Sequence, residues 1–270
     1  MPYASLLVYV NDRPELMVRI AVGLADKFGA SLIGVSASPI PPPAVANGIV
    51  ALLPTEDDIK QMRAKLAEHG NWFRSVAGDH RKPEWRQFLE FPVDVLSREA
   101  RCADLVIIGQ TERRFGEYGF VNPGEAILRM GRPTLVVPKG VGRLQAEHVV
   151  IGWKDTREAR RAVLDALPFL HEAARVTIVE LCGPGEEKTA LERIDDVMRY
   201  LTRHQIKGGP RVLLQKEGSG AAQLIRLAQD EGADLLVTGA YGHSRMGEWI
   251  FGGMTRELLE TSPICCLMSH

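Results

Sequence analysis

An internal repeat limits what this chain can fold into more than any other feature of its sequence. ADLVIIG at 103–109 returns as ADLLVTG 130 residues later, and RPTLVVP at 132–138 returns as SPICCLM with the same offset. Near the start of each half, VYVNDRPE at 8–15 returns as IGWKDTRE after 143 residues. The larger offset means that the first half holds an insertion, which we place in the proline-rich stretch 38–57, where no helical or strand period begins.

Within each half, short apolar runs alternate with stretches whose apolar residues have helical spacing. In the second half this pattern predicts strands at 148–154, 175–182, 210–217, 233–239 and 264–269, with helices at 156–173, 186–204 and 220–232. Such alternation favours right-handed βαβ units and a parallel sheet. We therefore predict an α/β fold of two tandem doubly wound parallel-sheet domains, 1–138 and 147–270, joined by a linker. Each domain is expected to have five strands in the order 3-2-1-4-5.

Charge and composition exclude several classes of function. A formal net charge of −1 gives no basic surface for general nucleic-acid binding. No apolar run approaches the roughly 20 residues of a membrane span, and the N-terminus lacks the features of a signal peptide, so we expect a cytoplasmic protein. The four cysteines form no C-x-x-C pair and the seven histidines have no metal-ligand spacing. These patterns predict reduced thiols and no metal site.

Aromatic and basic residues alternate in the stretch 63–86, which includes Trp72, Phe73 and Trp85. Such interleaving can bind single-stranded nucleic acid. A long helix that packs its aromatic face on the sheet explains the pattern more simply, and we predict that helix. The prolines at 39–43 are interpreted as a stiff surface excursion, with a polyproline docking segment as the alternative.

The glycine-rich stretch GAYGHSRMGEWIFGGMT at 239–255 is the main candidate for function. In the predicted strand order, Asp155 follows the first strand of the second half and Gly239 ends the fourth, so both border the crevice where ligands bind. Gly242 would let the backbone approach a ligand. An alternative interpretation remains open, in which the glycines only permit tight turns and Asp155 caps a helix.

The end of this stretch coincides with the start of the last predicted helix. Gly252 and Gly253 fall where that helix begins, and exposed N–H groups at a helix N-terminus attract anions. Thr255 could add a hydroxyl donor in the first turn, and His243 is a candidate anion contact from the loop. Ser244 does not complete a nucleophile elbow, because Met246 stands where that motif needs glycine.

The stretch 239–255 resembles the signature of the universal stress protein family. In that signature a glycine is followed by two residues, a glycine, nine residues and a glycine, which match Gly239, Gly242 and Gly252. The similarity includes the Asp155 end of the first strand and the closing TSPICCLM, and the repeat extends it over both halves. The chain thus looks like a tandem universal stress protein.

This resemblance implies an adenine-nucleotide alpha-hydrolase-like fold and a cytosolic stress-response protein. It also implies binding of ATP or a related adenine nucleotide, alone or with Mg²⁺, by a sensor or regulator that is not an enzyme. It would place Asp155 and Leu181 near the adenosine, and Gly239, Gly242, Gly252 and Gly253 near the ribose and phosphates. Slow ATP hydrolysis is the weaker enzymatic alternative, and a structural or interaction module that binds no nucleotide is the other.

The first half departs from the signature, since only Gly109 remains. The repeat offset places Glu112, Asn122 and Pro123 where the second half has glycines. Pro123 lacks an N–H donor and Glu112 would repel a phosphate. We therefore predict a first half that is a structural partner, and at most one nucleotide per chain. In the second half, Gly253 stands where the family often has Ser or Thr.

The expected partners are a nucleotide and unidentified proteins, without nucleic acid or membrane. In the predicted order the fifth strand of each half lies at a sheet edge, and open apolar edges tend to associate. We expect the two edges to pair within one chain as a pseudo-dimer, so that the halves unfold together and either half alone self-associates. Homodimerisation of the whole chain stays open.

Overall fold

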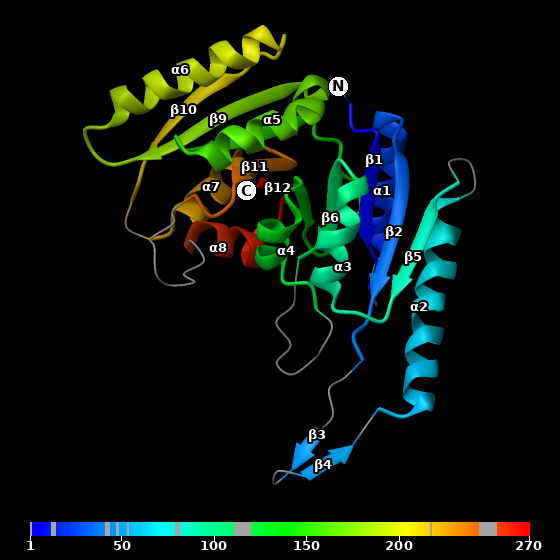
Figure 1. Cartoon of the computed structure of the whole chain (residues 1–270). Coiled ribbons are helices and arrows are strands. Elements are labelled where there is room, and N and C mark those ends of the chain that lie inside the picture. The colour runs from blue at the N-terminus through cyan, green and yellow to red at the C-terminus, as the bar shows by residue number, and fades with distance from the viewer. Residues whose placement is uncertain are drawn as a thin grey trace.

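One continuous ten-stranded sheet runs through both halves of the chain in the order β10-β9-β8-β11-β12-β7-β6-β1-β2-β5 (Figure 1). The structure is a computed structural model. It describes residues 2–11, 15–40, 44–46, 49–52, 54–78, 82–110, 120–216, 218–242 and 253–270. When the strands of this sheet are numbered one to five along the chain within each half, both halves follow the order 3-2-1-4-5. This order confirms the predicted α/β fold.

The first half begins with β1, α1 and β2 and continues through a small hairpin into α2. Its elements are β1 (Ser5–Tyr9), α1 (Glu15–Phe28), β2 (Ser31–Ala37), β3 (Ala44–Ala46), β4 (Ile49–Leu52), α2 (Glu56–Ala77), β5 (Glu84–Phe88), α3 (Pro92–Glu99), the 3-10 helix η1 (Ala100–Cys102), β6 (Leu105–Gly109), α4 (Pro123–Met130) and β7 (Thr134–Val137).

The second half repeats this plan without the hairpin. Its elements are β8 (His148–Trp153), α5 (Arg157–Glu172), β9 (Arg175–Cys182), α6 (Glu187–Arg203), β10 (Gly209–Leu214), α7 (Gly220–Asp230), β11 (Leu235–Gly239), α8 (Gly253–Thr261) and β12 (Cys265–Ser269). Strand register supports the repeat, because Leu6 of β1 pairs with Leu105 of β6 as Val149 of β8 pairs with Leu235 of β11. The domain boundaries predicted from the sequence stay a prediction.

The two halves join through their fifth strands. β7 and β12 pair antiparallel, with Cys266 opposite Val136 and Leu267 opposite Leu135. Every other neighbouring pair in this sheet is parallel. The expected pairing of the two apolar edges within one chain is confirmed, and neither β7 nor β12 is left as an open edge.

Helices cover both faces of the sheet, with two apolar layers beneath them. α1, α2, α5 and α6 contribute to one layer, and α3, α4, α7 and α8 contribute to the other. On the first face an aromatic cluster joins the halves, because Tyr3 and Phe28 pack edge-on against Phe169 of α5, with ring centroids 5.6 and 5.2 Å away. The Tyr3 hydroxyl donates to the carbonyl of Asp165 over 2.5 Å.

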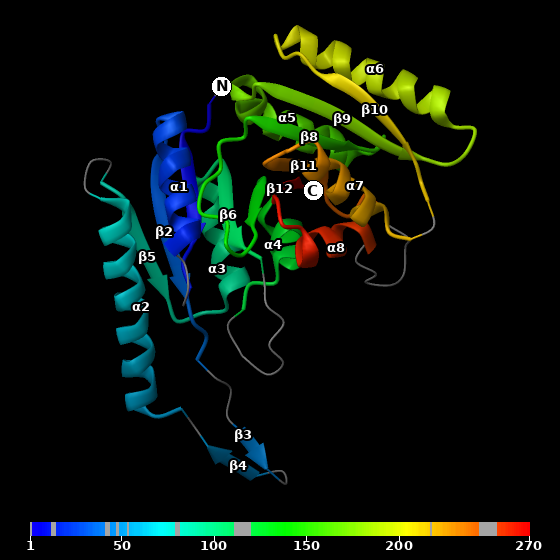
Figure 2. The same cartoon turned by 180° about the vertical axis from the view of Figure 1, so that it is seen from behind.

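Two elements differ from the sequence-based expectation. The insertion forms an antiparallel β3–β4 hairpin that extends away from the body of the molecule (Figure 2). The predicted long helix is α2, and Phe73 on it is fully buried against the sheet. Trp85, however, lies on β5, where its ring packs 5.5 Å from that of Phe73. The aromatic residues of this stretch thus serve packing, as predicted, but from two elements.

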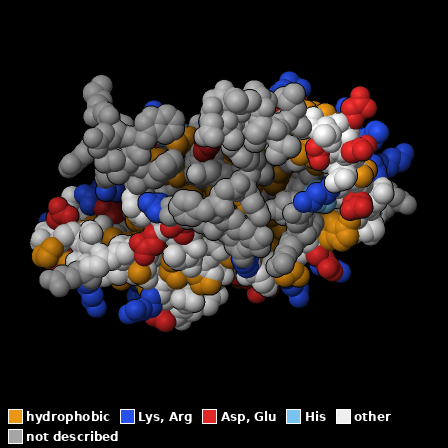
Figure 3. Space-filling model, turned by 90° about the horizontal axis from the view of Figure 1, so that it is seen from below, with side chains coloured by type: hydrophobic (Ala, Val, Ile, Leu, Met, Phe, Trp, Pro, Cys, Tyr) orange, Lys and Arg blue, Asp and Glu red, His pale blue; other side chains and the backbone are white. Residues whose placement is uncertain are grey.

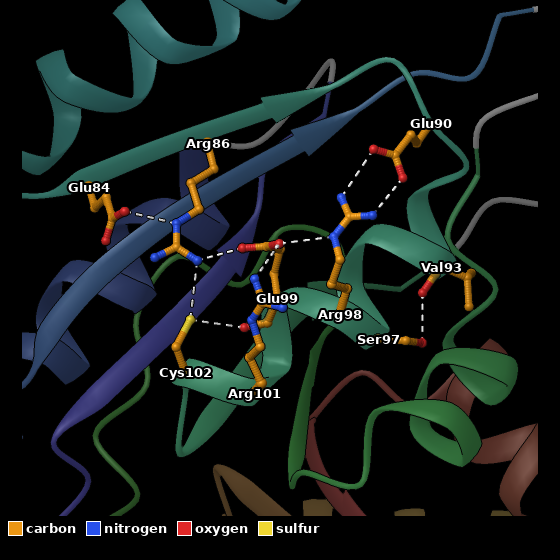
Figure 4. A network of polar contacts seen from close by, with 9 residues as sticks. All are labelled: Glu84, Arg86, Glu90, Val93, Ser97, Arg98, Glu99, Arg101 and Cys102. Atoms are coloured by element: carbon orange, nitrogen blue, oxygen red, sulfur yellow. Dashed lines mark hydrogen bonds and ion pairs between the residues drawn. The ribbon is translucent and has the colours of Figure 1, made fainter.

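The edge strand β5 is tied to α3 by a buried carboxylate (Figure 4). Glu99, 3% exposed, accepts hydrogen bonds from Arg86 at 2.5 Å and from Arg98 at 3.2 Å. Cys102 lies at the edge of this network, with its sulfur 3.2 Å from Arg86 Nη1. Burial alone would raise the pKa of Glu99, but the two guanidinium groups outweigh it and hold the pKa below its ordinary value.

The Glu99 network should make the free energy of unfolding depend on pH in the acidic range. A carboxyl with a lowered pKa in the folded state adds stability above its unfolded pKa of about 4.3, and this contribution is lost as pH falls through the folded pKa. Urea denaturation between pH 7 and pH 3 should show a smaller loss of unfolding free energy for Glu99→Gln than for the wild type. Glu192→Gln, on the exposed surface of α6, is the control, and equal curves for all three proteins would contradict the prediction.

The aromatic cluster between the halves should matter for the stability of the whole chain. Phe169→Ala removes a fully buried ring and should cost about 3–5 kcal/mol. Because one sheet spans both halves, urea denaturation should still show a single transition, at lower midpoint. Phe91→Ala, at a ring that is 53% exposed, should change the midpoint little. Two separate transitions in the wild type would show that the halves unfold independently.

Candidate functional site

The candidate site lies at the carboxyl ends of β8 and β11, which are neighbours in the middle of the second half. Gly152 of β8 pairs with Thr238 of β11, so the loops that follow both strands leave the same edge of the sheet. The loop after β8 leads into α5, and the loop after β11 carries Gly239 to Gly242. The structure therefore brings the Asp155 and glycine segments together, as the strand order predicts.

Gly239 lies directly against the first turn of α5. A Cβ atom at this position would be 2.5 Å from the backbone N of Ala159 and 2.7 Å from the carbonyl carbon of Glu158. Backbone atoms cannot rotate away as a side-chain end can. Gly239 therefore permits close packing of strand and helix.

Gly242 approaches the same helix more loosely. A Cβ atom here would lie 3.1 Å from Glu158 Oε2 and 3.1 Å from Thr156 Oγ1. Thr156 is the residue that caps α5, since its hydroxyl accepts the N–H of Ala159. The alternative interpretation in which Asp155 caps this helix is wrong. Asp155 precedes the cap and forms an ion pair with Arg160 at 2.6 Å, with its side chain 55% exposed.

Glu158 is a member of the site that the sequence analysis missed. Glu158 is 4% exposed, and its carboxylate pairs with Arg157. Burial raises the pKa of Glu158, but the hydrogen bond from Arg157 outweighs this and lowers the pKa overall. Carboxylates in the first turn of a helix usually face water and stabilise its dipole, so a buried acid beside a glycine loop had no separate signal in the sequence.

The N-terminus of α8 meets the glycine loop from another direction. Thr255, in the first turn of α8, accepts the backbone N–H of Tyr241 on its hydroxyl oxygen at 3.2 Å. Thr255 is buried, so this hydroxyl is an internal contact of the loop. Gly253 begins α8, and no described atom lies within 4 Å of a Cβ placed on it. His243 and Gly252 lie outside the described residues.

Leu181 lies two strands away from β11, on the far side of β8. It pairs with Leu213 of β10, and its Cδ2 atom would be 3.4 Å from a Cβ on Gly220 at the start of α7. Neighbouring strands are about 4.8 Å apart, so a ligand in contact with both Leu181 and the glycine loop would span about 10 Å along this edge. That length suits a nucleotide better than an inorganic anion.

Other kinds of site find little support in the part of the chain that the structure describes. No three His, Cys, Asp or Glu side chains of the described ranges are grouped so as to hold a metal ion. Burial raises the pKa of Cys265 to about 12 and that of Cys266 to about 11, which keeps both as thiols. No described helix is both long and apolar enough to cross a membrane. Seen from below, the described surface has acidic and basic side chains interspersed (Figure 3).

Comparison with known proteins gives the family. The model of the universal stress protein family matches residues 163–270. Residues 163–270 therefore form a universal stress protein domain. No curated protein matches the sequence.

Solved structures show that the similarity in fold extends beyond this universal stress protein domain. A universal stress protein from Archaeoglobus fulgidus DSM 4304 aligns over 98% of this chain and 95% of its own, with 12% identity and a TM-score of 0.73. A functionally unknown protein from Pseudomonas aeruginosa PAO1 aligns over 99% of this chain and 92% of its own, with 12% identity and a TM-score of 0.63. At such identities the similarity shows the fold alone. Both halves thus have the fold of universal stress proteins.

In the first half of this tandem universal stress protein fold, α4 corresponds to α8. The N-terminus of α4 is arranged differently from that of α8. Asn122 caps α4, because its side-chain oxygen accepts the N–H of Glu125 at 3.2 Å, and Pro123 follows as the first helical residue. The cap already occupies one of the donors that an anion would use, and Pro123 offers none. Glu112 lies outside the described residues. The assignment of the nucleotide residues in the second half remains a prediction.

Gly239 and Gly253 should respond differently to substitution by alanine. Gly239→Ala forces a Cβ atom against the backbone of α5 and should cost about 1–3 kcal/mol, as overpacking does. Gly253→Ala meets no described atom within 4 Å and should be neutral or stabilise the protein by up to about 1 kcal/mol, because alanine favours helices. Urea denaturation of both variants checks this, and equal stabilities would contradict a packing role for Gly239.

Proposed function

We propose that the second half binds an adenine nucleotide such as ATP at the carboxyl ends of β8 and β11. On this proposal the chain acts as a sensor or regulator in a stress response. One observation carries the proposal: the loop 239–242 lies between the N-termini of two helices. Gly242 adjoins the first turn of α5, and Tyr241 is hydrogen-bonded to the first turn of α8. The positive ends of two helix dipoles beside a glycine backbone favour a phosphate group.

The acidic side chains restrict which form of the nucleotide would bind. Glu158 beside Gly242 stays ionised at neutral pH, because its pKa is lowered. Its charge opposes a bare phosphate and favours one that carries a cation. Since the described residues form no metal site of their own, Mg²⁺ would enter with the nucleotide. Asp155 is half-exposed and would accept hydrogen bonds from the hydroxyl or amino groups of adenosine.

A second candidate function is an interaction module that binds no nucleotide. The contacts inside the site favour this alternative. Thr255 already accepts the N–H of Tyr241, Asp155 is paired with Arg160, and the carboxylate of Glu158 lies against Gly242. A site that satisfies these polar groups internally has less need of a ligand, although Trp153 Nε1 and Thr238 Oγ1, buried at the ends of β8 and β11, have no hydrogen-bond partner among the described residues. Direct binding measurements separate the two candidates.

Calorimetric titration of ATP and Mg²⁺ into protein freed of nucleotide is the direct test. We expect about one site per chain, because the α4 start of the first half is capped by Asn122. Gly242→Val should weaken binding about tenfold or more, equivalent to about 1.4 kcal/mol, in a variant that still folds but has a lower urea midpoint, because the side chains of Thr156 and Glu158 must shift to admit the new side chain. The matched control is Gly209→Val on β10, where no described atom lies within 4 Å of a Cβ.

Each outcome of this titration decides something. Two sites per chain would overturn the claim that the first half binds no nucleotide. Binding that Gly242→Val leaves unchanged in a folded variant would move the nucleotide away from the glycine loop. A wild type that does not bind would refute the proposed function and leave the interaction module as the better explanation.

A further inference from the structure

Tyr241 connects the glycine loop of the second half to the first half. It stands between Gly239 and Gly242, yet its ring reaches α4. A Cβ atom on Gly124, the second residue of α4, would overlap the Tyr241 hydroxyl oxygen and lie 3.2 Å from Cζ. α4 and α8 lie side by side in both views of the molecule (Figures 1 and 2). The absence of a side chain at Gly124 is what gives the Tyr241 ring its space.

The backbone of Tyr241 is held in an unfavourable conformation. Its φ angle is +59°, in the left-handed region that residues other than glycine rarely adopt. Such a residue costs about 1 kcal/mol or more, and it persists only where its surroundings fix it. Among the contacts that hold Tyr241 are the hydrogen bond from its N–H to Thr255 of α8 and the contact of its ring with Gly124.

The environment of the hydroxyl makes this contact a specific one. A Cβ on Gly124 would also lie 3.3 Å from Oδ1 of Asn122, the capping residue of α4. The hydroxyl therefore lies close to the capped start of this helix. Burial, and then the charge of Glu260, raise the pKa of Tyr241 to about 12. The group stays neutral and able to donate at physiological pH.

We propose that the first half positions the glycine loop of the second half, with Gly124 as the residue that admits Tyr241. Tyr241 is a positioning residue, which holds the loop 239–242 between α5 and α8. The consequence for ATP rests on the proposed function, but the positioning itself does not. The first half, although it has lost the glycine motif, would thereby take part in the site of the other half.

Gly124→Ala tests the contact with a change of one methyl group. The methyl group displaces the Tyr241 ring, so the amide of Tyr241 should exchange its hydrogen about tenfold faster or more, since local opening governs exchange. ATP affinity should fall about fivefold or more, because small displacements of binding groups are costly. Gly23→Ala in α1 is the matched control, a helical glycine with no described atom within 4 Å of its Cβ. It should change neither measurement.

Two further variants keep the test decisive. In Gly124→Ala combined with Tyr241→Phe, the overlapping oxygen is gone and the nearest ring atom is Cζ at 3.2 Å. This double variant should restore slow exchange and most of the affinity. Tyr241→Gly leaves α4 untouched, relieves the backbone strain and removes the ring. It should also release the loop, even if Gly124→Ala fails to fold.

The outcomes separate this inference from the proposed function. Unchanged exchange at residue 241 in both Gly124→Ala and Tyr241→Gly would overturn the inference, whether or not ATP binds. Failure of the double variant to recover would show that Gly124→Ala acts elsewhere, and would also overturn it. A wild type that does not bind ATP refutes the proposed function alone, because hydrogen exchange still reports the positioning of the loop.

Discussion

The antiparallel pairing of β7 with β12 is the constraint on which the rest of the structure depends. Each strand is buried and apolar, and each would otherwise be an open sheet edge. The pairing makes one sheet of two and lets Tyr3 and Phe28 pack on Phe169 across the two halves. Because α4 leads into β7 and α8 leads into β12 on the same face, it also sets these helices side by side.

The sheet could be predicted from the sequence because the patterns that indicate it can be recognised without knowledge of tertiary contacts. Central parallel strands are covered on both faces and therefore read as continuous apolar runs, and the repeat fixed which strands correspond. The β3–β4 hairpin was not predicted, although Asn47 and Gly48 between apolar residues are typical of a two-residue turn. The prolines before it suggested an irregular segment and obscured that signal.

The site could be predicted in place but not in detail. Strand order alone brought Asp155 and Gly239 to one edge of the sheet. Which residue caps α5, however, depends on backbone geometry within one or two positions, and Thr156 takes the role that the sequence left open for Asp155. Gly239 serves the approach of α5, and Glu158 is buried beside Gly242. Neither fact has a periodic signal, since both arise from the distance between a loop and a helix.

The contact between Tyr241 and Gly124 is the clearest case of a feature outside the reach of sequence patterns, since it exists only once the two fifth strands have paired. The first half replaces glycines of the motif with Asn122 and Pro123, which cap α4 from within the chain. A helix start closed in this way no longer needs an anion, so its surface is free to receive a neutral hydroxyl from the other half. Gly124, directly after Asn122 and Pro123, leaves the space at this helix start that the Tyr241 ring occupies.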